Sequence, residues 1–218
     1  YCFSSDVYRE HAVRIAAEYA KRYGANPFVQ AWQIDNEYGD HDTIHSYSEN
    51  AKKAFQRWLA VRYQTIEALN EAWGTAFWSM KYNRFDQVEL PNGLVEEPSP
   101  THLLDYQRFA SDEVVRFNRA QVDIVRKYAP GRPVTHNFMG HNVDFDHYKV
   151  GDDLDFASWD SYPMGALVHS RMDDQEKARL LRTGMPDQPA FNNDLYRRIG
   201  QGRAWIMEQQ PGPVNWAE

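Results

Sequence analysis

The sequence predicts an α/β fold with parallel strands, and its pattern favours a barrel. Four short segments separated by helical stretches are strand candidates: the apolar run 28–34 and residues 132–137, 154–162 and 203–210. Each segment ends in polar residues, namely Asn36-Glu37, His136-Asn137, Asp160 with Tyr162, and Glu208-Gln209. A parallel barrel carries its chemistry at the carboxyl ends of its strands. A doubly wound sheet does so too, but no Gly-rich phosphate loop follows any of these segments.

The first elements of the chain are a helix and a strand. Ser5 is a suitable N-cap for a helix that ends at Tyr23-Gly24. After Pro27, the apolar run "FVQAWQI" (28–34) has the length of a buried strand. The sequence therefore predicts one helix followed by one strand before Asn36-Glu37.

The sequence of residues 48–98 predicts helices that interrupt the alternation of strands and helices. A helix begins at Ser48 and buries Phe55 and Leu59, which lie on one helical face. Thr65 caps a shorter helix that runs through Trp73 and stops at Gly74. Residues 75–98 carry several Pro and Gly residues and indicate an excursion without repeating structure.

A long helix then leads into the remaining strands. Ser99-Pro100 is a strong start signal, because Pro is favoured at the first helical position. This helix ends before Pro130-Gly131, and two more helical stretches are predicted around 173–183 and 190–199.

Composition and charge exclude several classes of function. The formal net charge is −7, and basic residues are interleaved with acidic ones, so we expect no nucleic-acid partner. No apolar run reaches the roughly 18 residues of a membrane span. With Cys2 alone, no internal disulfide forms. The chain opens on Tyr1 rather than Met, which we interpret as an internal fragment of a longer, cytoplasmic protein; a signal peptide ahead of Tyr1 stays an open alternative.

Two glutamates follow strand candidates and lie far apart in the sequence. Glu37 and Glu208 can face each other across the mouth of a closed barrel. Such a carboxylate pair is what glycoside hydrolysis requires. The alternative is that each glutamate forms a structural ion pair with an arginine, and the residues alone leave the two interpretations equal. The high aromatic content, 14%, is likewise consistent with a large core or with a sugar site.

Several segments resemble glycoside hydrolase family 42 β-galactosidases. "WQIDNEYGDHDT" and "RAWIMEQQPGPVNWA" resemble two signature segments of that family, and "CFSSDVYREHAVRI", "THNFMG" and "DFASWDSYP" follow it in the same order. The resemblance implies a partial (β/α)8 TIM barrel with about strands four to seven present. On this basis residues 1–218 are part of a single catalytic barrel domain, truncated at both ends.

The resemblance also implies roles for individual residues. Glu37 would be the acid/base and Glu208 the nucleophile of a retaining hydrolysis of terminal, non-reducing β-D-galactosides, and Asn36 would hydrogen-bond the sugar 2-hydroxyl. Trp216 and Trp78 match sugar-binding positions; for Trp78, core packing is an equal alternative. Tyr162 is suited to donate a hydrogen bond to Glu208, and a core role is its alternative.

Further residues near these motifs are candidates for the site or for metal binding. His136 and Asn137 are candidates to reach the site from strand five. His41 and Asp42 have the chemistry of metal ligands, but we expect solvated or second-layer side chains there. Family members that bind zinc use four cysteines. Here Cys2 keeps the first position, whereas Ser46, Ser48 and Ala51 occupy the other three, so we expect no metal.

The expected substrate is therefore a β-galactoside, and we expect no cofactor, no nucleic acid and no membrane partner. The resemblance implies a homotrimer. Two alternatives remain open: another retaining β-glycosidase of the same clan, such as an arabinosidase or a glucosidase, and a non-catalytic carbohydrate-binding barrel.

Overall fold

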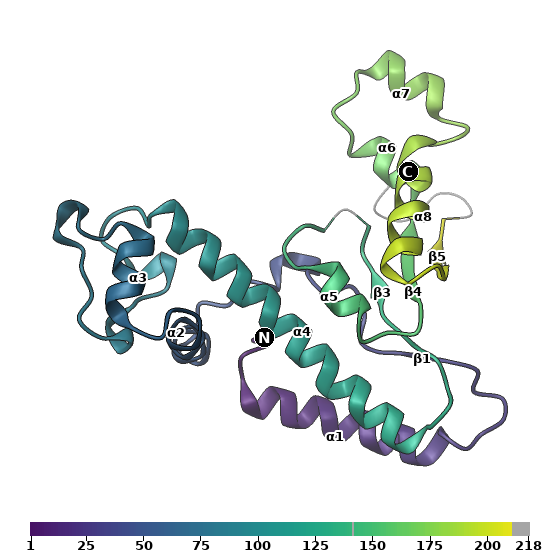
Figure 1. Ribbon diagram of the computed structural model, residues 1–218. Helices are drawn as coiled ribbons and strands as arrows, with labels where there is room; N and C mark the ends of the chain where they lie inside the picture. Colours follow the sequence, from purple (N-terminus) through teal and green to yellow (C-terminus); the bar gives the residue numbers. More distant parts are fainter. Residues whose placement is uncertain (141, 211–218) are drawn as a thin grey trace.

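The computed structural model describes residues 1–140 and 142–210 of the chain, with all side chains in that range except that of Trp78 (Figure 1). Within these residues, all of the strand pairs are parallel. β1 (Trp32–Gln33) pairs with β2 (Val134–Thr135), and β4 (Ala157–Ser161) pairs with both β3 (Asn137–Phe138) and β5 (Ala204–Gln209). Because only His136 separates β2 from β3, the strands form four neighbouring lines in chain order. This is the arrangement of consecutive strands in a parallel barrel.

β1 is shorter than the predicted strand 28–34, but its backbone pairing continues beyond Gln33. The Ile34 N–H donates to the Thr135 carbonyl at 2.7 Å, and the Glu37 N–H donates to the Asn137 carbonyl at 3.0 Å. Asp35 and Glu37 have positive φ angles of 54° and 45°, which end the regular strand. The chain therefore stays beside β2 and β3 up to Glu37, in a conformation that is no longer β.

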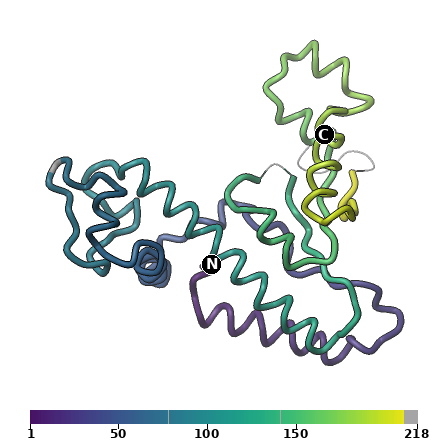
Figure 2. The backbone as a smooth tube through the Cα atoms, viewed as in Figure 1, coloured from purple at the N-terminus to yellow at the C-terminus, as the bar shows by residue number. Residues whose placement is uncertain are grey.

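Helices α1 (Asp6–Tyr23) and α4 (Pro100–Tyr128) begin where the sequence predicts. The Ser5 hydroxyl accepts a hydrogen bond from the Tyr8 N–H, and the Ser99 hydroxyl accepts one from the His102 N–H. The two helices pack side by side, with α1 along the second half of α4 (Figure 2). The apolar side chains of both helices pack in one core with residues of β1 and β2, so the helices cover these two strands.

The first half of α4 supports a separate group of elements, which we call the α2–α3 lobe. It contains α2 (Glu49–Tyr63) and α3 (Ile66–Trp73), capped by Ser48 and Thr65 as predicted. The predicted excursion adds three short 3-10 helices: η2 (Phe77–Ser79), η3 (Phe85–Gln87) and η4 (Pro91–Gly93). The lobe has its own core, built around Phe55, Leu59, Leu69, Trp73 and Phe109.

The second half of the chain adds helices around β4 and β5. These are α5 (His147–Gly151), α6 (Pro163–Val168), α7 (Asp174–Leu180) and α8 (Asp187–Ile199); the sequence predicts α7 and α8 but not the short α5 and α6. α8 covers β4, where the Tyr196 ring stacks on Trp159 with their centroids 5.8 Å apart. Trp159 therefore faces the helices, and the side chain of its neighbour Asp160 lies on the opposite side of the sheet.

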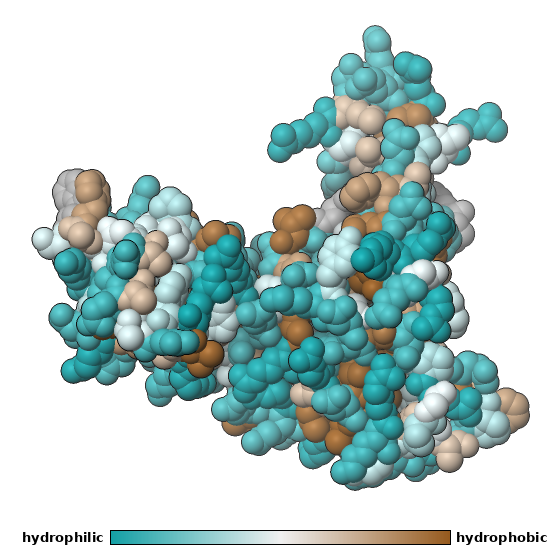
Figure 3. All heavy atoms as spheres, in the orientation of Figure 1, coloured by the Kyte–Doolittle hydropathy of each residue, from teal (hydrophilic) through white to brown (hydrophobic). Residues whose placement is uncertain are grey.

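Apolar side chains are exposed on the two flanks of the sheet. They are Val7, Ile15 and Tyr19 on α1, and Trp205 and Ile206 on β5. The face seen in Figure 3 is mostly hydrophilic, with a hollow between the α2–α3 lobe and the arm made by α6 and α7. Among the described helices, none combines the length and apolar character that crossing a bilayer needs.

Candidate active site

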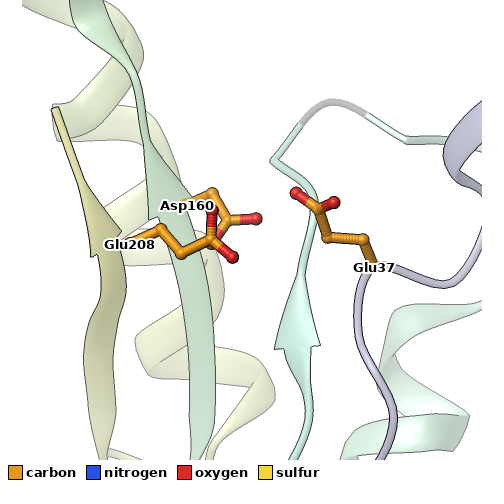
Figure 4. Close-up of side chains that lie close together, drawn as sticks. All are labelled: Glu37, Asp160 and Glu208. Carbon is orange, nitrogen blue, oxygen red and sulfur yellow. The ribbon is translucent and has the colours of Figure 1, made fainter. Parts of the chain in front are cut away.

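Three carboxyl groups from different elements meet at the carboxyl ends of the strands. They belong to Glu37, which follows β1, Asp160 on β4 and Glu208 on β5 (Figure 4). One oxygen from each group lies within 4.8 Å of an oxygen of each of the others. Figure 4 shows the Asp160 and Glu208 carboxyls next to each other, facing Glu37 across the gap. The structure thus brings together the two predicted glutamates and adds a third acid.

Glu208 is held by two hydrogen-bond donors. The Asn137 amide donates to Glu208 Oε1 at 3.0 Å, and the Tyr162 hydroxyl donates to Glu208 Oε2 at 2.7 Å. The hydrogen bond from Tyr162 to Glu208 is the largest of the effects that raise the pKa of Tyr162 well above its usual range. Since both donors stabilise a negative charge on the acceptor, this arrangement suits an ionised Glu208.

Asn137 also connects the two sides of the site. Its side-chain amide donates to Asn36 Oδ1 at 3.0 Å, and Gln33 Nε2 donates to the same oxygen at 2.8 Å. Asn36 is therefore fixed with its oxygen occupied, and its N–H2 group donates to no other group among the described residues. Of the two candidates on the strand line formed by β2 and β3, Asn137 reaches the site.

Glu37 sits on a strained backbone. Its φ of 45°, two residues after Asp35 at 54°, lies in the left-handed region that non-glycine residues rarely adopt. Such conformations persist only where surrounding contacts impose them, and they are frequent at functional sites. Here the hydrogen bond from the Glu37 N–H to the Asn137 carbonyl imposes it. The turn aims the Glu37 side chain at Glu208 rather than into solvent.

Asp160 is the member of the group that our sequence reasoning did not single out. Its side chain follows an irregularity in the pairing of β4 with β5, between Trp159 and Asp160, and such bulges re-aim side chains. Asp160 is only 5% exposed. Burial, then the Glu37 side chain, and then the charges of Glu208 and Glu37 raise its pKa to about 9, so it is neutral near pH 7. The signal available in the sequence was its place at a strand end.

A divalent cation prefers several ionised carboxylates, and the three acids are the one group of potential ligands that the described residues bring together. A neutral Asp160 and the two donors already directed at Glu208 are unfavourable for such an ion. The arrangement fits proton transfer and nucleophilic attack better than metal binding.

The other candidates lie elsewhere. His136 is fully buried, with its ring stacked on Tyr38 at 4.0 Å and Nδ1 2.7 Å from the Ile34 carbonyl, and burial lowers its pKa to about 3. His41 is in η1 (Asp40–Asp42), where its side chain is 90% exposed. Trp78 is in η2 of the α2–α3 lobe, and Trp216 lies outside the described residues, so the roles of both tryptophans stay predictions.

The positions that match the family's zinc ligands do come together. The Ser48 hydroxyl donates to Cys2 Sγ at 3.3 Å, and the Ser46 hydroxyl donates to Ser48 at 3.2 Å. Ala51, at the fourth position, is buried at the start of α2. A hydrogen-bonded cluster of hydroxyls and one thiol therefore occupies this place, and it lacks the thiolates that zinc prefers.

Known proteins match this chain along its whole length. The family model described as beta-galactosidase of glycoside hydrolase family 42 covers residues 1–218. A beta-galactosidase of Thermus thermophilus is 59% identical over 217 residues, which are 100% of this chain and 34% of that protein. The chain therefore spans about a third of the length of the curated relatives that it matches.

Solved structures agree. The beta-galactosidase of the psychrophilic Marinomonas ef1 matches with a TM-score of 0.96 and 56% identity, over 100% of this chain and 33% of the other. That of the Antarctic haloarchaeon Halorubrum lacusprofundi gives 0.93 and 46%, over 100% and 32%. These neighbours have TIM barrels, so the four strand lines described above are part of a (β/α)8 barrel. The chain belongs to the beta-galactosidases of glycoside hydrolase family 42.

Proposed function

We propose that the protein containing this chain hydrolyses terminal, non-reducing β-D-galactosides with retention of configuration. The observation that carries the proposal is the distance between the Glu37 and Glu208 carboxyls, whose nearest oxygens lie within 4.8 Å of each other. Retaining glycosidases hold their two carboxyls about 5–5.5 Å apart, whereas inverting enzymes need about 6.5–9.5 Å to admit a water molecule. The short separation supports direct attack by one carboxylate on the sugar.

The surroundings of each glutamate support a division of roles. Glu208 accepts hydrogen bonds on both oxygens and is suited to be the ionised nucleophile, which attacks the anomeric carbon. Glu37 gives its proton to the departing glycosidic oxygen, and a glycosyl ester forms on Glu208. In the second step Glu37 takes a proton from water, the water oxygen bonds to the anomeric carbon, and Glu208 leaves as a carboxylate.

Roles in substrate binding are proposed for four residues, three of which contact the sugar and one of which holds Glu208. Asn36, whose oxygen is occupied by Gln33 and Asn137, presents its N–H2 group to the sugar 2-hydroxyl. Trp216 and Trp78 would pack on the apolar face of the sugar, and Tyr162 would hold Glu208 in line. No residue of this set requires a cofactor. The names of the relatives favour galactosides over the arabinosides and glucosides of the alternative proposals.

We further propose that residues 1–218 are part of one catalytic barrel domain of a longer chain, which assembles as a homotrimer. The exposed apolar residues of α1 and β5 favour the proposal that further elements of the barrel pack against both flanks of the sheet. Light scattering of the full-length protein tests the trimer, since a monomer or dimer would contradict it.

Azide rescue in the full-length enzyme tests the roles of the glutamates. Glu208→Gly should abolish turnover of a nitrophenyl β-galactoside, and azide should restore it by giving the α-galactosyl azide, because the small anion attacks from the vacated side. Glu37→Ala should keep activity on substrates with good leaving groups, and azide should then give the β-azide. The β-azide from Glu208→Gly would reverse the roles. A wild-type protein that binds galactosides without hydrolysing any would instead favour the carbohydrate-binding alternative.

A further inference from the structure

Asp160 has the properties of a group that acts on its neighbours without touching the substrate. It is 5% exposed, and among the described residues neither carboxyl oxygen has a hydrogen-bond partner of normal geometry. A buried carboxyl without partners is costly when ionised. In Figure 4 it lies between the elements that carry the two glutamates, beside Glu208 and facing Glu37.

The three acids differ in the donors that they already have. Glu208 accepts one hydrogen bond on each oxygen, from Asn137 and Tyr162. For the Glu37 carboxyl, the described residues supply no hydrogen-bond donor of normal geometry, although Asp160 lies near enough to interact with it. A protonated Asp160 therefore has one neighbour whose charged form lacks a donor, and that neighbour is Glu37.

We propose that Asp160 is a positioning residue that stays protonated through the reaction and donates a hydrogen bond to Glu37 when Glu37 is ionised and acts as the base. The proposal rests on the function proposed above. In the first step Glu37 holds its own proton. Once it has given that proton away, Glu208 is an uncharged ester, and the neutral carboxyl of Asp160 can turn toward the only charge left among the three acids. No proton leaves Asp160, so the stoichiometry of hydrolysis is unchanged.

The proposal predicts a distinct alkaline limit for the second step. The titratable groups that surround Asp160 are Glu37 beyond β1, Glu208 on β5, Tyr162 after β4 and Tyr196 on α8, whereas β3 contributes the neutral Asn137. The pKa values of both tyrosines are raised far above the usual value, so neither titrates near pH 9. Burial is the largest of the effects that raise the pKa of Asp160, and burial persists when Glu208 becomes an ester, so the donor is present at neutral pH and is lost at alkaline pH.

The test uses the full-length enzyme and 2,4-dinitrophenyl β-D-galactoside, whose good leaving group makes breakdown of the glycosyl-enzyme rate-limiting. Asp160→Asn keeps the shape and supplies a neutral N–H donor, whereas Asp160→Leu supplies none. We expect kcat at pH 7 to stay within about threefold for Asp160→Asn and to fall about 10- to 100-fold for Asp160→Leu, the usual range for losing a hydrogen bond to a charged group. The wild-type kcat should decline at alkaline pH, and Asp160→Asn should remove this decline.

Asp155→Asn is the matched control, because Asp155 lies before the same strand but contacts the Val134 N–H and Arg126. It should leave the alkaline decline in place. If Asp160→Leu fails to fold, Asp160→Asn alone decides. An Asp160→Asn enzyme that loses activity as severely as Asp160→Leu, or that keeps the wild-type alkaline decline, would overturn the proposal. Wild-type protein without galactosidase activity would instead refute the proposed function, so the two failures are distinguishable.

Discussion

The hydrogen bond from Tyr162 to Glu208 makes a prediction about which step of the reaction it serves. In the first step Glu208 loses negative charge as it attacks, so a donor on its oxygen favours the ground state. In the second step Glu208 regains its charge as the ester breaks, so the same donor favours the transition state. Tyr162→Phe should therefore slow breakdown of the glycosyl-enzyme more than its formation.

The magnitude follows from the geometry. The O–H···O distance is 2.7 Å, which is typical of a charge-assisted bond. Such bonds are worth about 1.5–3 kcal/mol. Because Tyr162 and Glu208 are both half-buried, solvent screens part of the interaction, and we take the lower portion of that range. At 1.36 kcal/mol for each factor of ten, the expected loss is roughly 10- to 30-fold.

The assay separates the two steps. With a dinitrophenyl β-galactoside, kcat reports breakdown of the glycosyl-enzyme and kcat/KM reports its formation. We expect kcat of the full-length Tyr162→Phe enzyme to fall roughly 10- to 30-fold, kcat/KM not to fall, and a burst of dinitrophenol to show the intermediate accumulating. Asn137→Ala should lower both constants, because Asn137 also fixes Asn36. A Tyr162→Phe enzyme whose kcat/KM falls as much as its kcat would refute this reasoning.

Four further predictions concern stability and assembly. Asp105 is fully buried, accepts hydrogen bonds from Tyr63 and Trp73, and pairs with Arg108. Asp105→Ala should therefore lower the free energy of unfolding by about 3–5 kcal/mol in urea titrations, and Asp105→Asn should lower it by less. Equal values for the two variants would contradict this. His102, His136 and His147 have pKa values lowered by burial to about 4, 3 and 4, so the unfolded chain binds more protons than the native chain below about pH 6.5. Stability should therefore drop between pH 7 and pH 5 by on the order of 2 kcal/mol for each histidine, and His147→Asn should reduce the drop. Purified protein should hold no stoichiometric zinc, and a chelator should leave its melting temperature unchanged, whereas elemental analysis finding one zinc per chain would contradict the loss of the cysteine site. Residues 1–218 expressed alone should be inactive and should bind hydrophobic dyes, because β1 and β5 are open edges beside exposed apolar residues; a soluble, cooperatively melting monomer would be evidence against this.

Helix starts could be predicted from the sequence because capping is local. Ser5, Ser48, Thr65 and Ser99 each accept a hydrogen bond from an N–H three residues ahead, and that contact depends on no distant part of the chain. Helix α5 is also capped, by Asp146, but α5 has five residues and α6 six, which are too few to show a helical period.

Strand ends were harder to predict, because they depend on partners. The apolar run 28–34 has the composition of a full strand, but positive φ angles at Asp35 and Glu37 end its regular geometry, and they follow from pairing with the chain near Asn137. For the same reason the sequence could not distinguish Asn137, which reaches the site, from His136, which is buried in the core. Adjacent residues of a strand face opposite sides, so a single register decides between them.

Two strand lines separate Glu37 from Glu208, and side chains from these lines fill the space between the two glutamates. Glu37 and Glu208 belong to the first and the last of four lines, which would be roughly 14 Å apart in a flat sheet with strands about 4.8 Å from each other. Curvature of the barrel and two long side chains reduce the gap between their oxygens to within 4.8 Å. Shortening either residue to aspartate would withdraw its carboxyl by about one carbon–carbon bond, roughly 1.5 Å, toward the separation at which direct attack is no longer possible. The two inner lines fill the remaining space with Asn137 and Asp160, one a donor to the nucleophile and the other an acid too buried to ionise near neutral pH. Curvature and side-chain length therefore set the separation of the glutamates, whereas the two strand lines between them supply the neighbours that make their environments different.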